Sequence, residues 1–176
     1  DYLALHQLEQ PFLNQTGERV LKELARQADE TLAGYKINRL EHGLQSATRA
    51  FNDGADIDWI VGALLHDIGD TLAPNNHPSI AAGIVKPFVS EANHWMVLHH
   101  GIFQGYYFFH YLGLDRNLRD QYKDHPHYER TLEFIEKYDA PAFDPDAEYF
   151  ELSFFEPMME RVFKKPKRSL YINDSA

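Results

Sequence analysis

The strongest constraint on this fold is a histidine–aspartate pair, His66-Asp67, at the end of a continuous apolar run. The run begins at Val61 and continues through two leucines to the pair, after which Ile68 and Gly69 end the segment. A run of this kind is typical of a helix buried in a core, so the pair is expected at the wall of that core. An imidazole beside a carboxylate suits a metal site there, because one carboxylate can bridge two cations while the histidine binds one of them.

Apolar residues recur at helical spacing along most of the chain, and strand patterns and internal repeats are not evident. The pattern predicts helices over residues 16–34, 38–52, 56–69, 78–88, 90–111, 115–123, 126–138 and 147–163. Asp56 and Ser90 are expected to cap two of these helices, and Leu32 belongs to the apolar face of the first. A loop is expected over 70–76, which holds Pro74. We therefore expect an all-α, single-domain helical bundle spanning the 176 residues.

Composition excludes several classes of function. The formal charge of −10 opposes general nucleic-acid binding, and the only basic cluster is expected in a solvated tail. That cluster consists of Lys164, Lys165, Lys167 and Arg168. No run approaches the roughly 20 apolar residues of a membrane span, and no targeting pattern is present, so we expect a cytoplasmic protein without membrane contact. The chain has no cysteine and ten histidines, so a metal site must use nitrogen and oxygen ligands.

Further histidines and aspartates lie before and after the pair, each on a different predicted helix or helix end. They are His42, His77, the neighbours His99 and His100, and Asp139. The steps from His42 to His66, Asp67 to His77, His77 to His100, and His100 to Asp139 are 24, 10, 23 and 39 residues. Antiparallel helices can bring residues with these separations to one point. Four histidines with two aspartates exceed the needs of one tetrahedral ion, so we expect two ions bridged by Asp67. Such donors suit iron, manganese or zinc and do not suit calcium.

Each of these residues also has a simpler explanation when taken alone. His42 can be a surface residue of its helix, His77 can cap the helix that Pro78 begins, and Asp139 can be a solvated helix end. Only one of His99 and His100 is required to face inward. The metal interpretation depends on all the candidates acting together.

The order of these residues resembles that of the HD-domain superfamily, over about residues 38–145. The core motif is Leu-Leu-His-Asp-Ile-Gly at 64–69, the first metal histidine matches His42 within Leu-Glu-His-Gly-Leu-Gln at 40–45, and the last carboxylate matches Asp139. The superfamily includes phosphohydrolases, which cut phosphate esters. It also includes mixed-valent diiron oxygenases, among them myo-inositol oxygenase and enzymes that oxidatively cleave carbon–phosphorus bonds.

Two segments are similar to the oxygenase branch. Residues 40–45 resemble the phosphonate oxygenases around their first iron histidine, and residues 100–104 with 137–139 resemble myo-inositol oxygenase around its last histidine and aspartate. The resemblance implies a first iron bound by His42, His66, Asp67 and Asp139, and a second bound by Asp67, His77 and His100. The resemblance also favours His100 over His99 as the ligand, because the family's glycine-aromatic sequence, here Gly101-Ile102-Phe103, directly follows His100.

The substrate-binding residues of neither oxygenase type are present. Asp70 stands where inositol oxygenase has a lysine, and Gln104 and Gly105 stand near the basic pair of the phosphonate oxygenases. Leu32 and Tyr35 lie near the sequence positions at which the same enzymes have a tyrosine and a glutamate. We therefore carry over the metal site and leave the substrate open. The candidates for substrate contact are Tyr35, Asp70, Gln104 and Tyr106, and the candidates for a supporting role behind the ligands are Glu41 and His99.

These features predict an enzyme that uses an Fe(II)/Fe(III) pair and O2 to oxidise or cleave a small hydroxylated metabolite. Asp67 is the expected catalytic residue, and manganese, zinc or another divalent ion is the alternative to iron. Aromatic walls are expected from Phe103 and residues 106–109, although a helix that is apolar all round is also typical of plain core.

A metal-dependent phosphohydrolase is the alternative function, and a metal-binding domain without turnover is a third. In the hydrolase, the metals would activate water, and Arg116, Arg119 and Lys123 would neutralise the phosphate. The expected partners are a small substrate and O2. The chain is expected to be a monomer or a homodimer, since apolar residues near the last helix can pack on the core or on a second subunit. These residues are Tyr149, Phe150, Phe154, Phe155 and Met158.

Overall fold

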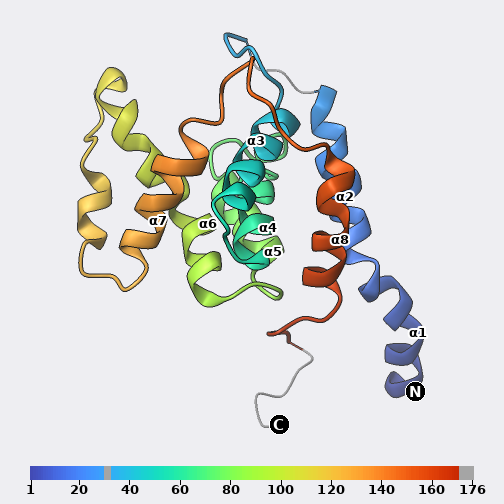
Figure 1. Cartoon of the computed structure of the whole chain (residues 1–176). Helices are drawn as coiled ribbons and strands as arrows, with labels where there is room; N and C mark the ends of the chain where they lie inside the picture. Colours follow the sequence, from blue (N-terminus) through green and yellow to red (C-terminus); the bar gives the residue numbers. More distant parts are fainter. Residues whose placement is uncertain (30–32, 171–176) are drawn as a thin grey trace.

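The computed structural model describes residues 1–29 and 33–170, and the chain within these ranges is helical, with no strand. The centre of the bundle consists of α3 (Arg39–Asn52), α4 (Ile57–Leu65), α5 (His77–Val85) and α6 (Glu91–Gln104) (Figure 1). On one side lie α2 (Thr16–Arg26) and α8 (Leu152–Phe163), and on the other lies α7 (Tyr128–Phe134). The all-α class is therefore confirmed.

The core forms where the apolar α4 meets its neighbours. All its residues from Trp59 to Leu65 are buried, as the continuous apolar run predicts. Side chains at the helix starts fix where the central helices begin: Asp56 accepts a hydrogen bond from the backbone of Trp59, and Ser90 from that of Asn93. Both predicted caps are therefore confirmed. The helices α4 and α6 consequently enter the core at defined residues.

Several predicted helices are shorter than expected. The first consists of α2 and a 3-10 turn over Gln27–Asp29, and Leu32 lies outside the described residues. The helix predicted over 56–69 ends at Leu65 and continues as turns over 66–72. The helix predicted over 90–111 ends at Gln104 and continues as 3-10 turns over Gly105–Tyr107 and Phe109–Leu112. Folding these turns back brings the ring of Phe109 against Gly105, where a Cβ atom would collide with it.

The last three predicted helices also differ in their bounds. The segment predicted over 115–123 holds only a 3-10 turn, Leu118–Tyr122. The helix predicted over 126–138 is α7 followed by a π-turn, Ile135–Asp139, and the helix predicted from 147 begins at Leu152. Short elements such as these depend on tertiary packing more than on local sequence pattern.

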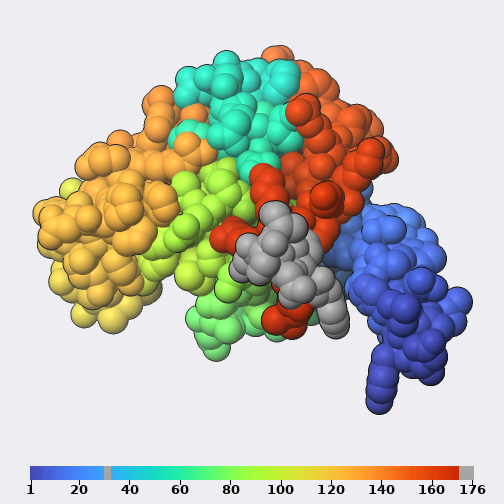
Figure 2. Space-filling model, turned by 90° about the horizontal axis from the view of Figure 1, so that it is seen from below, coloured from blue at the N-terminus to red at the C-terminus, as the bar shows by residue number. Residues whose placement is uncertain are grey.

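One helix was not predicted. The first helix, α1 (Tyr2–Asn14), projects from the body of the molecule, and none of its residues is buried (Figure 2). Its apolar side chains face outward, with Tyr2 91% and Leu8 76% exposed. Within the part of the chain that the structure describes, neither α1 nor any other helix combines the length and apolar character needed to cross a bilayer.

The apolar residues near the last helix pack on the core of the same chain. Phe155 is fully buried, and the rings of Phe150 and Phe154 stack on each other and meet Phe51 of α3 edge-on. Tyr149 and Met158 are partly buried against the same core. These side chains therefore join α8 to α3 rather than forming a free apolar face.

Candidate metal centre

The six predicted ligands converge in the middle of the bundle. They are His42 on α3, His66 and Asp67 immediately after α4, His77 at the start of α5, His100 on α6, and Asp139 at the end of the π-turn. The donor atoms form two groups on either side of the Asp67 carboxylate, which we call the deep half and the outer half. The deep half consists of His42, His66 and Asp139, and the outer half of His77 and His100.

The deep half is completely buried. His42 Nε2 lies 3.1 Å from His66 Nε2 and 3.2 Å from Asp139 Oδ1, and His66 Nε2 lies 3.6 Å from the same carboxylate oxygen. Asp67 Oδ2 lies 3.5 Å from His42 Nε2 and 3.6 Å from His66 Nε2. Four side chains therefore aim one donor each at the same small region.

The outer half uses the other oxygen of the same carboxylate. Asp67 Oδ1 lies 3.1 Å from His77 Nε2 and 3.1 Å from His100 Nε2. The two imidazole nitrogens are 3.2 Å apart, so the three donors form a nearly equilateral triangle. Asp67 thus presents one oxygen to each half, which is the arrangement a bridging carboxylate needs.

These donor sets fit metal ions. Two ligands at right angles, each about 2.1–2.2 Å from one ion, are about 3.0 Å apart, which is close to the separations in both halves. The buried Oδ2 atom of Asp139 has no hydrogen-bond partner, and such an atom is costly unless a cation or another donor satisfies it. Nitrogen and carboxylate oxygen donors of this kind suit iron, manganese or zinc.

Backbone carbonyls orient all four histidines. The Nδ1 atoms of His42, His66 and His100 lie 2.8, 2.7 and 2.7 Å from the carbonyl oxygens of residues 142, 63 and 97. The Nδ1 atom of His77 lies 3.2 Å from the carbonyl of residue 74. Because a carbonyl oxygen only accepts, each Nδ1 donates its hydrogen, and each Nε2, once it has lost its proton, directs a lone pair into the centre.

Two local features of the backbone bring the donors together. At Gly69 a Cβ atom would lie 2.7 Å from the carbonyl oxygen of His77, so only glycine allows the start of α5 to approach the turn that carries Asp67. At the other side, the amide of Ala140 donates to the carbonyl of Ile135, a five-residue step that widens the helix. This π-turn sets the direction of Asp139, and π-turns are frequent at functional sites.

The charges of the centre strongly shift the pKa values of its groups. Burial lowers the pKa of His66, but the negative charges of Asp67 and Asp139 outweigh burial and raise it to about 9. Burial would raise the pKa of both aspartates, but the adjacent histidines hold the pKa of each well below its usual range. Burial also acts against the charged form of His77, whose pKa is nevertheless raised by its hydrogen bond with Asp67. A metal ion would therefore displace protons from this cluster, so its binding must depend on pH.

A cavity of about 400 Å³ borders the outer half. Asp67 and His77 form one part of its wall, and three of the four proposed substrate contacts, Tyr35, Asp70 and Gln104, also line it. The fourth, Tyr106, does not line it and instead stacks against two arginines. Gln104 also donates a 2.9 Å hydrogen bond from Nε2 to Asp139 Oδ1. Of the aromatic walls expected from the sequence, Tyr107 and Phe108 border the cavity, whereas Phe103 is buried in the core.

Sequence reasoning missed one charged residue of this cavity. Arg39 lines the wall, and its Nη2 atom lies 2.6 Å from Asp70 Oδ2. The residue directly precedes the motif that contains His42, and its spacing of three residues from that histidine places both on one face of α3. That spacing is the signal that could have identified it.

The two residues proposed for a supporting role lie away from the donor atoms. His99 stacks on Trp95 with ring centroids 3.9 Å apart and meets Tyr122 edge-on. Glu41 forms a capping box with Asn38, in which each side chain bonds the backbone of the other residue. Glu41 therefore stabilises the start of the helix that carries His42.

The arginines proposed for phosphate binding also lie outside the cavity wall. The guanidinium carbons of Arg116 and Arg119 lie 4.1 and 3.8 Å from the centre of the Tyr106 ring. Lys123 pairs with Asp120 at 2.8 Å. Cation–π contacts explain the positions of the two arginines.

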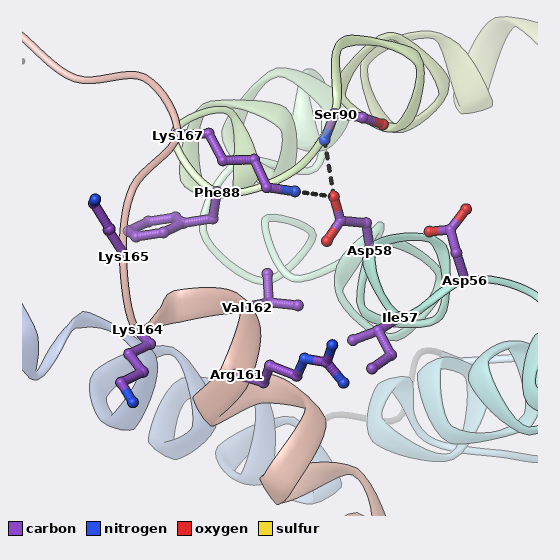
Figure 3. A pocket seen from close by; sticks show the side chains of 10 residues that line it. All are labelled: Asp56, Ile57, Asp58, Phe88, Ser90, Arg161, Val162, Lys164, Lys165 and Lys167. Carbon is purple, nitrogen blue, oxygen red and sulfur yellow. Dashed lines mark hydrogen bonds and ion pairs between the residues drawn. The ribbon is translucent and has the colours of Figure 1, made fainter. Parts of the chain in front are cut away.

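The three lysines of the basic cluster near the end of the chain border a separate hollow of about 840 Å³ (Figure 3). There Lys167 pairs with Asp58, which also accepts a hydrogen bond from the backbone of Ser90. Arg168 donates a 2.7 Å hydrogen bond to the carbonyl of Val89. The expectation of a solvated tail was therefore wrong for Arg168, whereas Lys167 is 51% exposed; both residues attach the segment after α8 to the bundle. Lys164 and Lys165 point away from Asp58.

No protein-family model matches this chain, and no curated protein is significantly similar to it.

Proposed function

We propose that the chain is an oxygenase with a dinuclear metal centre, most simply a pair of iron ions, which oxidises or cleaves a small hydroxylated metabolite. The observation that carries this proposal is the outer half, in which two histidines and one carboxylate lie 3.1–3.2 Å from one another beside a cavity. Two histidines and one carboxylate with open positions are the ligand set of many non-haem iron oxygenases.

The two halves differ in how many positions they leave open. An ion in the deep half would have four protein donors, from His42, His66, Asp67 and Asp139, of which only Asp67 lines the cavity. An ion in the outer half would have three donors, so positions toward the cavity would be free for substrate and O2. His77 is 22% exposed, whereas His42 and Asp139 are 0% exposed, so the chemistry belongs to the outer half.

In this proposal, the side chains around the centre orient the metal ligands and exclude water from the cavity. The aromatic rings of Tyr107, Phe108 and Phe143 wall the cavity and restrict the access of solvent. The phenyl ring of Phe143 stacks on His42 with centroids 4.0 Å apart and fixes that imidazole. A bound iron pair would supply the redox chemistry with O2, which no side chain of this chain can provide.

A phosphohydrolase remains the second candidate, because Arg39 lies beside the centre. A dinuclear site can lower the pKa of water and clamp a phosphate, and the reaction needs positive charge near the leaving group. Arg39 lines the cavity, unlike the arginines that the sequence suggested. Its position is therefore the specific observation that favours hydrolysis.

The test is to purify the protein under low oxygen, measure iron, and screen hydroxylated metabolites for oxygen consumption. We expect two irons per chain, a mixed-valent electron paramagnetic resonance signal that one substrate perturbs, and consumption of O2 that depends on this substrate. The His100→Ala variant should lose this activity, whereas His99→Ala, a change at the adjacent histidine, should keep it. Turnover of a phosphate ester with manganese or cobalt, unaffected by O2, would contradict the oxygenase and support the hydrolase.

A further inference from the structure

Arg39 is a largely buried cation whose hydrogen-bonding capacity is mostly unused. Its side chain is 13% exposed, and its only contact within hydrogen-bond distance, among the residues that the structure describes, is that of Nη2 with Asp70 Oδ2 at 2.6 Å. Its Nη1 atom lies 3.9 Å from Asp67 Oδ2, beyond hydrogen-bond range, and its Nε atom is buried without a partner. A guanidinium carries five N–H donors in a rigid fork, so several N–H groups of Arg39 lack an acceptor: that of Nε is buried, and those of Nη1 are left for a ligand.

The charge around Arg39 depends on whether the centre holds metal. With the histidines neutral, as metal ligands must be, Asp67, Asp70 and Asp139 carry three negative charges against the single positive charge of Arg39. Two divalent cations would add four positive charges and reverse the sign of the site. Asp70 does not oppose a negatively charged ligand, because its own charge is paired with Arg39. The loaded centre therefore favours an anion.

We infer that Arg39 binds an oxoanion group of the substrate, either a carboxylate or a phosphoryl group. This inference rests on the dinuclear centre proposed above. Arg39, Asp67 and His77 line the same cavity, so one small molecule can reach both the guanidinium and the outer half. The fork geometry of arginine matches two oxygens of such a group. A volume of about 400 Å³ suits a small metabolite, and the ring of Tyr35, 5.1 Å from the guanidinium carbon, helps to hold the arginine in place.

The test measures binding rather than turnover, using protein loaded with zinc so that no reaction with O2 interferes. Glycolate, inorganic phosphate and the neutral ethylene glycol are titrated into the wild type and into Arg39→Gln, and metal is counted in every sample. We expect glycolate or phosphate to bind the wild type, and Arg39→Gln to bind it at least tenfold more weakly while keeping two metals. Ethylene glycol should bind both proteins equally. Whichever of the two anions binds more tightly identifies the group that Arg39 recognises, a carboxylate or a phosphoryl group.

Two further variants keep the test decisive. Arg116→Gln removes an arginine that stacks on Tyr106 outside the cavity, and it should bind the anions like the wild type. Arg39→Lys keeps the positive charge but lacks the fork, and we expect it to bind the anions severalfold more weakly than the wild type. It is the variant to use if Arg39→Gln does not fold. Equal anion binding by the wild type and the Arg39 variants, or no anion binding by wild type that holds two metals, overturns the role of Arg39 alone. A wild type that takes up no metal overturns the metal centre, and with it this inference, before any anion is added.

Discussion

The two halves of the candidate centre use the same kinds of donor but differ in their access to solvent. In the deep half, His42, His66 and Asp139 are fully buried between α3, the end of α4 and the π-turn. In the outer half, His100 is just as buried, but His77 follows the loop over 70–76 and is 22% exposed beside the cavity. The difference teaches that the exposure of one donor, His77, and not donor type, distinguishes the half of the candidate centre that a small molecule could reach from the half that it could not.

The deep half should be the part whose loss damages the protein most. Replacing Asp139 with Asn removes a carboxylate that faces His42 and His66 within the core. We expect the metal count to fall from two to one. We also expect the metal-free protein to lose about 3–5 kcal/mol of stability, the usual effect of breaking a buried pair, or roughly 10 °C in Tm. Metal analysis and thermal unfolding measure both effects. The exposed Glu136 of the same π-turn supplies the control, Glu136→Gln, which should change neither quantity.

The outer half should lose its metal without loss of the fold. His77→Ala removes one corner of the outer triangle, and because this residue is partly exposed, little packing is lost. We expect one metal per chain instead of two, no turnover, and a Tm within about 2 °C of the wild type. His110→Ala, at an exposed histidine, should retain two metals. A His77→Ala protein that unfolds, or one that keeps both ions, would erase the distinction between the halves.

The stability of the metal-free protein should decrease as pH rises from about 6.5 to about 9. The pKa of His66 is raised from 6.5 to about 9 by the surrounding carboxylates, so the folded state holds this proton more tightly than the unfolded state does. The stabilisation is complete below the unfolded pKa and is lost as pH rises through the folded pKa. Its magnitude is on the order of 3 kcal/mol.

Metal should remove this dependence, because an ion takes the place of the proton. Thermal unfolding of the metal-free and the metal-loaded protein across this pH range tests the expectation. If Tm falls with pH in the same way for both proteins, the deep half does not bind metal.

The smallest effect is expected at the start of the helix that carries His42. Asn38→Ala removes the side chain that accepts a hydrogen bond from the Glu41 amide at 2.8 Å. Loss of such a cap costs about 1 kcal/mol, which corresponds to a decrease in Tm of about 2–4 °C. Both metals should remain, since no donor is altered. Loss of a metal in this variant would mean that the capping box directly determines the position of His42.

Much of this arrangement could be predicted from local patterns. The continuous apolar run predicted the buried α4 and placed the His66-Asp67 pair at its end, and the caps at Asp56 and Ser90 fixed two helix starts. These features depend on short stretches of chain, so the sequence contains them directly. Assignment to the HD-domain superfamily and the identity of the metals stay predictions.

Other features depend on packing between distant segments and were beyond such patterns. The five-residue step at Ile135 that directs Asp139 has no clear sequence signature, and the pairing of Arg39 with Asp70 joins α3 to the turn after α4. The helix α1 was not predicted because Pro11 lies within it, and its apolar residues form no face that packs on the core.

The most direct test of a shared carboxylate is the metal content of Asp67→Ala, compared with the wild type and with Asp70→Asn. Asp67 faces both halves, with Oδ2 toward His42 and Oδ1 toward His77 and His100, whereas Asp70 pairs with Arg39. We expect two ions per chain in the wild type and in Asp70→Asn, and none in Asp67→Ala. An Asp67→Ala protein that still holds two ions would contradict the bridge and the dinuclear centre built on it.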